Sequence, residues 1–204
     1  MEIRGLNFSY PGESPLFRDF CFFSNAPLIV LKGSSGCGKT TLLKILFGGI
    51  FNGLVFDKFD VSRKSYIILQ DDALCPWLTG MQNINKFMSC DQDDFERSSL
   101  FQHTQSFINK KVCNMSFGQR RLVELFRSLL FKPQLLLWDE PLNYLDMLSR
   151  NIVVNELHNF IKDNSQRQVI LSDHISQEFG AIPHEIYLFP DKKPITELYC
   201  EKVS

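Results

Sequence analysis

One short segment constrains this chain more than any other feature of its sequence. Residues 33–40 read Gly-Ser-Ser-Gly-Cys-Gly-Lys-Thr and fit the pattern G-x-x-x-x-G-K-[ST]. They follow the apolar run Leu28–Leu31, which is typical of a buried strand, and they lead into a predicted helix over Thr40–Phe47. A strand, a loop of this pattern and a helix together predict a phosphate-binding loop.

The residue types in this loop explain how it would bind phosphate. The glycines let the backbone turn tightly enough to aim its N–H groups at phosphate oxygens. The N-terminus of the following helix adds a partial positive charge, Lys39 adds a full one, and Thr40 offers a hydroxyl to Mg²⁺. The predicted nucleotide-binding residues of this segment are Gly33, Ser34, Ser35, Gly36, Cys37, Gly38, Lys39, Thr40 and Thr41.

Composition limits the kind of protein that carries this loop. With 204 residues and 44% hydrophobic side chains, the chain can bury a sizeable core, and one domain is expected. The net charge of −1 does not indicate a surface for nucleic acid. The six cysteines lack zinc-like spacing and are expected to be reduced thiols of a cytosolic protein. No apolar stretch reaches the roughly 18 residues of a membrane helix, so the chain is not expected to form a pore itself.

Short apolar runs alternate with helical patterns, which indicates an α/β fold with a largely parallel sheet. The predicted strands are Ile3–Ser9, Leu28–Leu31, Ser65–Leu69, Leu135–Trp138, Val169–Leu171 and Glu185–Phe189. The predicted helices are Thr40–Phe47, Gln119–Phe131 and Ser149–Asn164. The more polar stretch from Asp71 to Asn114 is expected to be a helical insertion between two parts of the core.

A second motif places two acidic residues after a buried strand. Leu135–Trp138 leads directly into Asp139 and Glu140, and ligands of open α/β sheets bind at the C-terminal ends of strands. In this Walker B pattern, Asp139 is expected to hold Mg²⁺, and Glu140 to orient and deprotonate the water that attacks the γ-phosphate. An acidic pair here also fits a helix N-terminus or a turn, but the phosphate-binding loop in the same chain favours the catalytic interpretation.

From residue 10 to about residue 178, the chain resembles a nucleotide-binding subunit of the ATP-binding cassette (ABC) family. The segment Asn114–Arg121, Asn-Met-Ser-Phe-Gly-Gln-Arg-Arg, is similar to the LSGGQ signature of that family, although its Ser116 also fits a helix N-cap. The resemblance implies a RecA-like P-loop NTPase core with a small antiparallel β-subdomain and an inserted α-helical subdomain. It implies a single ABC ATPase domain over 1–204, with a core of 1–70 and 128–204 and a helical subdomain of about 71–127.

Four further residues match loops of the family in their expected order. Gln70 resembles the Q-loop glutamine, which contacts Mg²⁺ and the attacking water and senses the membrane partner. Asp146 matches the D-loop at the dimer interface, His174 the switch histidine that hydrogen-bonds the γ-phosphate, and Tyr10 the aromatic that stacks on adenine. The resemblance implies a catalytic set of Glu140, His174 and Gln70, and metal ligands Thr40, Gln70 and Asp139.

The resemblance also implies partners. In the family, two subunits pack head to tail, and the signature of one closes over the ATP·Mg²⁺ that the other binds. In this chain that signature would be contributed in trans by Ser116, Phe117, Gly118 and Gln119. The expected protein is an ATPase that dimerises with itself or with a second ABC subunit and drives separate transmembrane permease subunits, with a solute-binding protein if it serves import. It would be peripheral on the cytoplasmic face of the cell membrane.

Some residues depart from the family pattern. Phe117 replaces the first signature glycine and must point away from phosphate, the segment before Gln70 suggests a trimmed β-subdomain, and Asp173 precedes the switch histidine, as in some lipid-related exporters. The run Pro76-Trp77-Leu78-Thr79 resembles the corresponding segment in importers of nitrate, sulfonates, taurine and thiamine-like precursors. The alternative is that Trp77 simply packs within the helical insertion.

Two alternatives to a transporter ATPase are a soluble ABC ATPase acting in translation or repair, and a regulatory protein that binds ATP without useful turnover.

Overall fold

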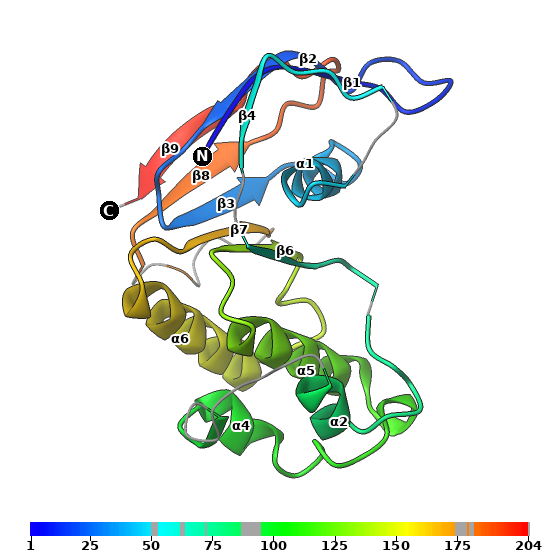
Figure 1. The fold of residues 1–204 in the computed structure, drawn as a ribbon, viewed down its shortest axis with the longest axis vertical. Helices are drawn as coiled ribbons and strands as arrows, with labels where there is room; N and C mark the ends of the chain where they lie inside the picture. Colours follow the sequence, from blue (N-terminus) through cyan, green and yellow to red (C-terminus); the bar gives the residue numbers. More distant parts are fainter. Residues whose placement is uncertain are drawn as a thin grey trace.

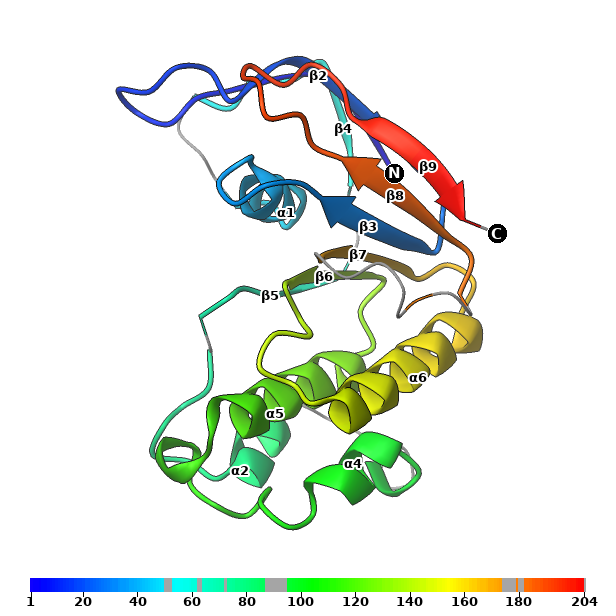
Figure 2. The same cartoon turned by 180° about the vertical axis from the view of Figure 1, so that it is seen from behind.

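The computed structural model describes residues 1–49, 53–61, 64–71, 73–86, 95–173, 179 and 182–203. Figure 1 and Figure 2 show its elements from two sides. In chain order they are β1 (Glu2–Phe8), β2 (Phe17–Phe23), β3 (Leu28–Lys32), α1 (Lys39–Leu46), β4 (Lys58–Asp60), β5 (Ser65–Ile68), α2 (Gly80–Asn85), α4 (Ser99–Thr104), the 3-10 turn η1 (Val112–Asn114), α5 (Phe117–Leu130), β6 (Leu135–Asp139), α6 (Met147–Asp163), β7 (Gln168–Ser172), β8 (His184–Leu188) and β9 (Tyr199–Val203).

A six-stranded sheet with the order β5-β6-β7-β3-β8-β9 forms the centre of the fold. The first five strands in this order are parallel, and β9 runs antiparallel beside β8. Helices α5 and α6 cover one face, and α1 lies on the other (Figure 1). Because both faces are covered, every residue of β6 and β7 is buried, which explains why these strands read as continuous apolar runs.

Two hydrophobic cores lie on opposite sides of this sheet. Neighbouring residues of a strand point to opposite faces, so Leu136 and Trp138 belong to the core beneath α5 and α6, whereas Leu135 and Leu137 belong to the core around α1. A slip of one residue in the pairing would exchange the two sets, and burial on both faces therefore fixes the register.

A small antiparallel sheet with the order β2-β1-β4 lies over α1 as an outer layer (Figure 1). The predicted α/β fold with a small antiparallel β-subdomain is confirmed. Strand β2 was not predicted because its apolar alternation is interrupted: Phe17, Phe20 and Phe22 are buried, but Asp19 between them has a φ of 48° and shifts the register. Strands β4 and β9 also escaped prediction, β4 because it is only three residues long.

The helical layer on the other side of the sheet contains α2, α4, α5 and α6 (Figure 2). The predicted helical insertion is present as α2, α4 and η1 within the part of residues 71–114 that the structure describes. The helix predicted over Gln119–Phe131 is α5, and it runs continuously through the subdomain boundary predicted at residues 127/128. Among the described residues, no helix combines the length and apolar character needed to cross a bilayer.

The elements predicted from periodicity lie where they were expected. All six predicted strands are present as β1, β3, β5, β6, β7 and β8, each with ends within one residue of the prediction. The helices predicted over Thr40–Phe47 and Ser149–Asn164 are α1 and α6. Since the five parallel strands run in one direction, the loops that follow β3, β5, β6 and β7 emerge at the same edge of the sheet, where the site is found.

Candidate nucleotide-binding site

The loop after β3 has the backbone that its glycines permit. Gly33 has a φ of 154°, and a Cβ there would lie 2.8 Å from both Cys37 Sγ and the Cβ of Phe189. Gly38, with a φ of 120°, directly precedes α1. A side chain would be strained at either position, so the backbone conformation of the loop itself requires these two glycines. The start of the loop is tied to the segment after β8, because Ser34 Oγ donates to Asp191 Oδ1 at 2.8 Å.

Lys39 is held beneath this loop. Its side chain is 5% exposed, and its Nζ donates to the carbonyl oxygens of Gly33 at 2.7 Å and Ser34 at 2.9 Å. A third contact, at 3.7 Å, joins Nζ to Cys37 Sγ. The ammonium group therefore lies inside the curve of the loop, where a charge can interact with a phosphate bound by the loop amides.

The carboxylate of Asp139 lies beside the hydroxyl of Thr40, as their predicted joint role requires. Thr40 Oγ1 donates to Asp139 Oδ2 at 2.6 Å, and Ser172 Oγ donates to Asp139 Oδ1 at 2.6 Å. Asp139 is fully buried. A hydroxyl and a carboxylate side by side supply the oxygen ligands that Mg²⁺ prefers. Within the described residues, no cluster of three or more His, Cys, Asp or Glu side chains provides another metal site.

Glu140 follows the strand in a conformation rare for a residue with a side chain. Its φ is 48°, and its N–H donates to Ser172 O at 3.2 Å and to Ser172 Oγ at 2.9 Å. Asn143 Nδ2 donates to Glu140 Oε2 at 2.6 Å. Such strained backbone persists only where surrounding bonds hold it, and here those bonds fix the direction of a carboxylate.

A pocket of about 360 Å³ brings several of these residues together. Tyr10, the loop residues Ser35 to Thr41 except Cys37, Gln70 and Glu140 line it, although they come from four separate parts of the chain. Tyr10 OH lies 2.8 Å from Thr41 Oγ1, so the ring is anchored at the mouth of the loop. The lining also includes residues that the sequence did not single out, namely Glu13, Ser14, Leu16 and Lys193.

The signature residues lie elsewhere and start α5. Ser116 is the N-cap: its Oγ accepts from Gln119 N at 3.2 Å, and Gln119 Oε1 accepts from Ser116 N at 3.2 Å. This reciprocal capping box satisfies two amides at the helix start. Neither the signature nor Asp146 contributes to the lining of the pocket. The predicted N-cap is confirmed, while a role toward nucleotide stays a prediction.

The side chain of Phe117 points outward into solvent, and its orientation away from phosphate stays a prediction. It is 65% exposed, its ring centroid lies 5.7 Å from that of Tyr144, and the Arg120 guanidinium lies 4.4 Å from the same ring. Gly118, by contrast, cannot carry a side chain freely, because an added Cβ would lie 2.7 Å from Tyr144 O. The second signature glycine is therefore required by close packing within this chain.

Asp146 starts α6. It is the N-cap, and its Oδ1 accepts from Ser149 N at 2.8 Å. This backbone hydrogen bond, with a further one from the Ser149 side chain, lowers the pKa of the Asp146 carboxyl below its ordinary value. The structure thus gives Asp146 a local capping role, and its predicted place at a dimer interface stays a prediction.

Two further expectations have different outcomes. Trp77 is 68% exposed, so the alternative that it packs within the helical insertion is wrong. His174 lies outside the described residues. Asp173 before it is buried, and its N–H donates to Leu31 O at 3.2 Å.

Comparisons with known proteins agree with this site. A family model described as "ABC transporter" matches residues 22–143. The chain is 29% identical to the spermidine/putrescine import ATP-binding protein of Mycoplasma capricolum over 94% of this chain, and spans 64% of the length of that relative. It is 31% identical to an aliphatic sulfonates import ATP-binding protein of Agrobacterium fabrum, over 83% of this chain and 68% of that protein.

A solved structure agrees in fold. The structure of an ATP-binding subunit of an ABC transporter superposes with a TM-score of 0.79 at 17% identity and covers 99% of this chain and 89% of that one. The family model covers more than half of the chain and includes both the phosphate-binding loop and the acidic pair after β6. The chain belongs to the ABC transporter family.

Proposed function

We propose that this chain is the ATP-binding and ATP-hydrolysing subunit of an ABC transporter. One observation carries the proposal: Lys39, the Thr40–Asp139 pair and Glu140 surround the end of a phosphate-binding loop, and Gln70 and Glu140 line the same pocket. These are the groups that nucleotide hydrolysis needs, and they lie in a member of a family whose related proteins are named ATP-binding proteins of import systems.

ATP would bind with its phosphates in the loop and its adenine toward Tyr10. The loop amides and Lys39 offset the phosphate charge. Thr40 and Asp139 are the residues that would hold Mg²⁺, with Gln70 nearby, and Ser172 keeps the buried carboxylate in place. When bound, Mg²⁺ would neutralise charge on the β- and γ-phosphate oxygens.

Glu140 would act as the general base. Its carboxylate takes a proton from water as the water oxygen attacks the γ-phosphorus, and the bond to the β-phosphate oxygen breaks to leave ADP. The hydrogen bond from Asn143 orients this carboxylate, and the strained backbone at Glu140 keeps it at the end of β6. Gln70 and His174 are proposed to position the water and the γ-phosphate.

A dimer would complete the site. The signature lies away from the pocket of its own chain, and exposed apolar side chains surround it and the start of α6: Phe117, Tyr144, Met147 and Leu148. A second subunit, either a copy of this chain or another ABC subunit, would place its signature over the bound ATP and bury this surface. Two ATP would then lie between the subunits, and hydrolysis would reopen them.

Closing and reopening of such a dimer would drive conformational change in separate membrane subunits. We propose import as the direction of transport because the related proteins named above serve import of polyamines or sulfonates, and because Trp77 is exposed beside the Q-loop. Transmembrane permease subunits and a solute-binding protein are the partners of this proposal, and the cytoplasmic face of the membrane is its location. A regulatory subunit without turnover is the second candidate, and the bulky Phe117 in the signature favours it.

The test is ATP-dependent dimerisation of Glu140→Gln in the presence of Mg²⁺, followed by size-exclusion chromatography. The variant should bind ATP, lose hydrolysis by a factor of about 10²–10⁴ and accumulate as a dimer, because the base is gone but the binding groups remain. The matched control is the Lys39→Ala, Glu140→Gln double variant, which should stay monomeric.

The outcomes separate the candidates. Full turnover by Glu140→Gln would remove that residue from its role. Binding of ATP by the wild-type chain without turnover, alone or with a permease, would favour the regulatory subunit. A dimer that forms equally in the double variant would not be an ATP sandwich.

A further inference from the structure

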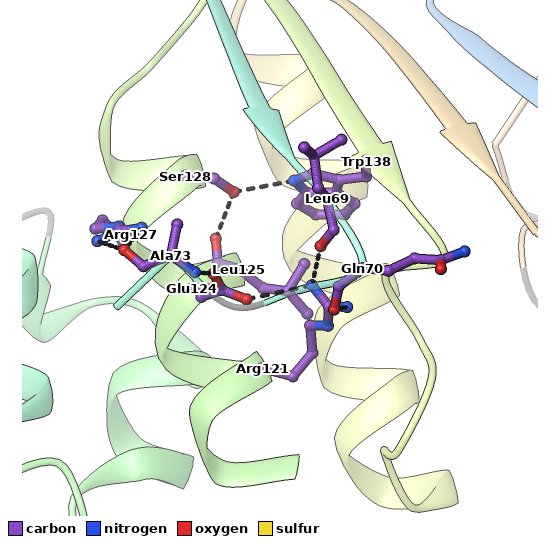
Figure 3. A network of polar contacts seen from close by, with 9 residues as sticks. All are labelled: Leu69, Gln70, Ala73, Arg121, Glu124, Leu125, Arg127, Ser128 and Trp138. Carbon is purple, nitrogen blue, oxygen red and sulfur yellow. Dashed lines mark hydrogen bonds and ion pairs between the residues drawn. The ribbon is translucent and has the colours of Figure 1, made fainter. Parts of the chain in front are cut away.

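An ion pair inside the helical layer bonds the backbone that carries Gln70. Arg121 Nη1 donates to Leu69 O at 2.9 Å and to Glu124 Oε2 at 3.2 Å, and its Nη2 donates to Gln70 O at 3.0 Å (Figure 3). The second carboxylate oxygen, Glu124 Oε1, accepts from Ala73 N at 2.7 Å. The pair therefore bonds the backbone of the loop after β5 both before Asp71, at Leu69 and Gln70, and after it, at Ala73.

The side chains of Arg121 and Glu124 are both buried. Arg121 is 4% and Glu124 2% exposed, and they lie three residues apart on the same face of α5. A buried ion pair is costly to desolvate unless its remaining donors and acceptors are also used. Here the guanidinium donates to two backbone carbonyl groups, and the carboxylate accepts from one backbone N–H, all in the loop after β5.

Helix α5 connects the Arg121–Glu124 pair to the signature and to strand β6. Its N-terminus is the signature, capped by Ser116, and Arg121 lies in the turns that follow. Farther along, Ser128 Oγ accepts from Trp138 Nε1 at 3.1 Å, and Trp138 directly precedes Asp139 (Figure 3). Helix α5 thus carries the signature at its start and contacts both the Q-loop backbone and the strand that carries the acidic pair.

We propose that Arg121 and Glu124 are positioning residues that fasten the Q-loop to the signature helix, so that Gln70 keeps its place in the nucleotide pocket and moves together with α5. The proposal rests on the proposed function, because it assigns the pair to the geometry of ATP hydrolysis. The pair bonds the backbone at Leu69, Gln70 and Ala73, and Gln70 lines the pocket. A displacement of about 1 Å at such a group is enough to slow a reaction by about a hundredfold.

The test replaces the pair by apolar side chains of similar size, in the double variant Arg121→Met, Glu124→Leu. Removing both charges together avoids an orphaned buried charge, so the fold should survive. We expect kcat for ATP to fall about tenfold to a hundredfold while the Kd for ATP stays within about twofold. Amide hydrogen exchange should accelerate in residues 69–78 and not in β3 or α1.

Two further variants separate positioning from stability. Arg167→Met removes another buried arginine, which bonds Phe160 O at 2.7 Å and Asp163 at the end of α6, and it should leave kcat and exchange in residues 69–78 unchanged. Arg121→Lys keeps the charge and one donor toward the carbonyl groups, so its kcat should lie between those of the wild type and the double variant.

Each result decides the proposal. Unchanged exchange in residues 69–78 of the double variant overturns it, and so does faster exchange spread equally over α5 and the sheet, which would mean a merely structural pair. A double variant with wild-type kcat also overturns it. If the wild-type chain itself does not hydrolyse ATP, the proposed function fails, while the exchange measurement still shows whether the pair fastens the loop.

Discussion

Ser172 donates a hydrogen bond of 2.6 Å to the buried carboxylate of Asp139, its direct partner across the β6–β7 ladder. The same hydroxyl accepts from Glu140 N at 2.9 Å. Ser172 thus bonds both the carboxylate of Asp139, the proposed metal ligand, and the backbone of Glu140, the proposed general base. Its position is set by the pairing of two strands, and the loop after β6 depends on that pairing.

The variant Ser172→Ala should weaken this arrangement. Loss of a hydrogen bond to a buried charged group costs about 1.5–3 kcal/mol, so we expect ATP hydrolysis to need a higher Mg²⁺ concentration and kcat to fall. Titration of ATPase activity with Mg²⁺ measures this. Ser128→Ala is the matched control, since Ser128 is equally buried but bonds Trp138 and Leu125 O. Equal Mg²⁺ dependence in both variants would contradict the assignment.

The variant Lys39→Ala should bind ATP about tenfold to a hundredfold more weakly, because charge-assisted bonds worth about 1.5–3 kcal/mol are lost. Fluorescence titration with an ATP analogue measures this affinity. Lys44→Ala, in the last turn of the same helix, is the control and should keep wild-type affinity. Unchanged binding by Lys39→Ala would show that the ammonium does not face the phosphates.

The variant Gly118→Ala should destabilise the fold, although alanine normally favours a helix. The new Cβ would lie 2.7 Å from Tyr144 O, so the loop after β6 or the start of α5 must shift. Such overpacking costs about 1–3 kcal/mol of the free energy of unfolding. Thermal unfolding checks it, with the exposed Phe117→Ala as a control that keeps the melting temperature. A Gly118→Ala protein that melts at or above the wild-type temperature would contradict the close approach.

Asp146 should make part of the stability depend on pH. Its pKa is lowered in the folded chain by the bond from Ser149 N, so its charge stabilises the fold above the ordinary value of 3.8 and this contribution is lost as the pH falls toward the lowered folded-state pKa. Asp146→Asn keeps a capping oxygen but does not titrate. The difference in melting temperature between the two proteins should therefore shrink between pH 5 and about pH 3. A constant difference would contradict the role of the charge.

Local patterns predicted the parts of the site that depend on local chemistry. The phosphate-binding loop requires its glycines and Lys39 in a fixed order, and the acidic pair follows an apolar strand, so both are visible before folding. Periodicity located the strands and helices of the core because burial on both faces leaves long apolar runs.

The remaining features of the site depend on contacts between residues far apart in the sequence, so local patterns did not predict them. Ser172 gains its role from the residue opposite it on β6, and the Arg121–Glu124 pair from the packing of α5 beneath the end of β5. Strand β2 was missed because the positive φ of Asp19 breaks its alternation. None of these features leaves a signal within a short window of sequence.

The chain leaves the sheet for the helical layer after β5 and returns to it through β6, and these two strands are neighbours at one end of the strand order. Strand β3, which carries the phosphate-binding loop, has partners on both sides. Insertions or deletions between β5 and β6 can therefore alter the helices proposed to meet a partner without disturbing the register of β3. The phosphate-binding loop can therefore stay unchanged within the family while the helical layer varies.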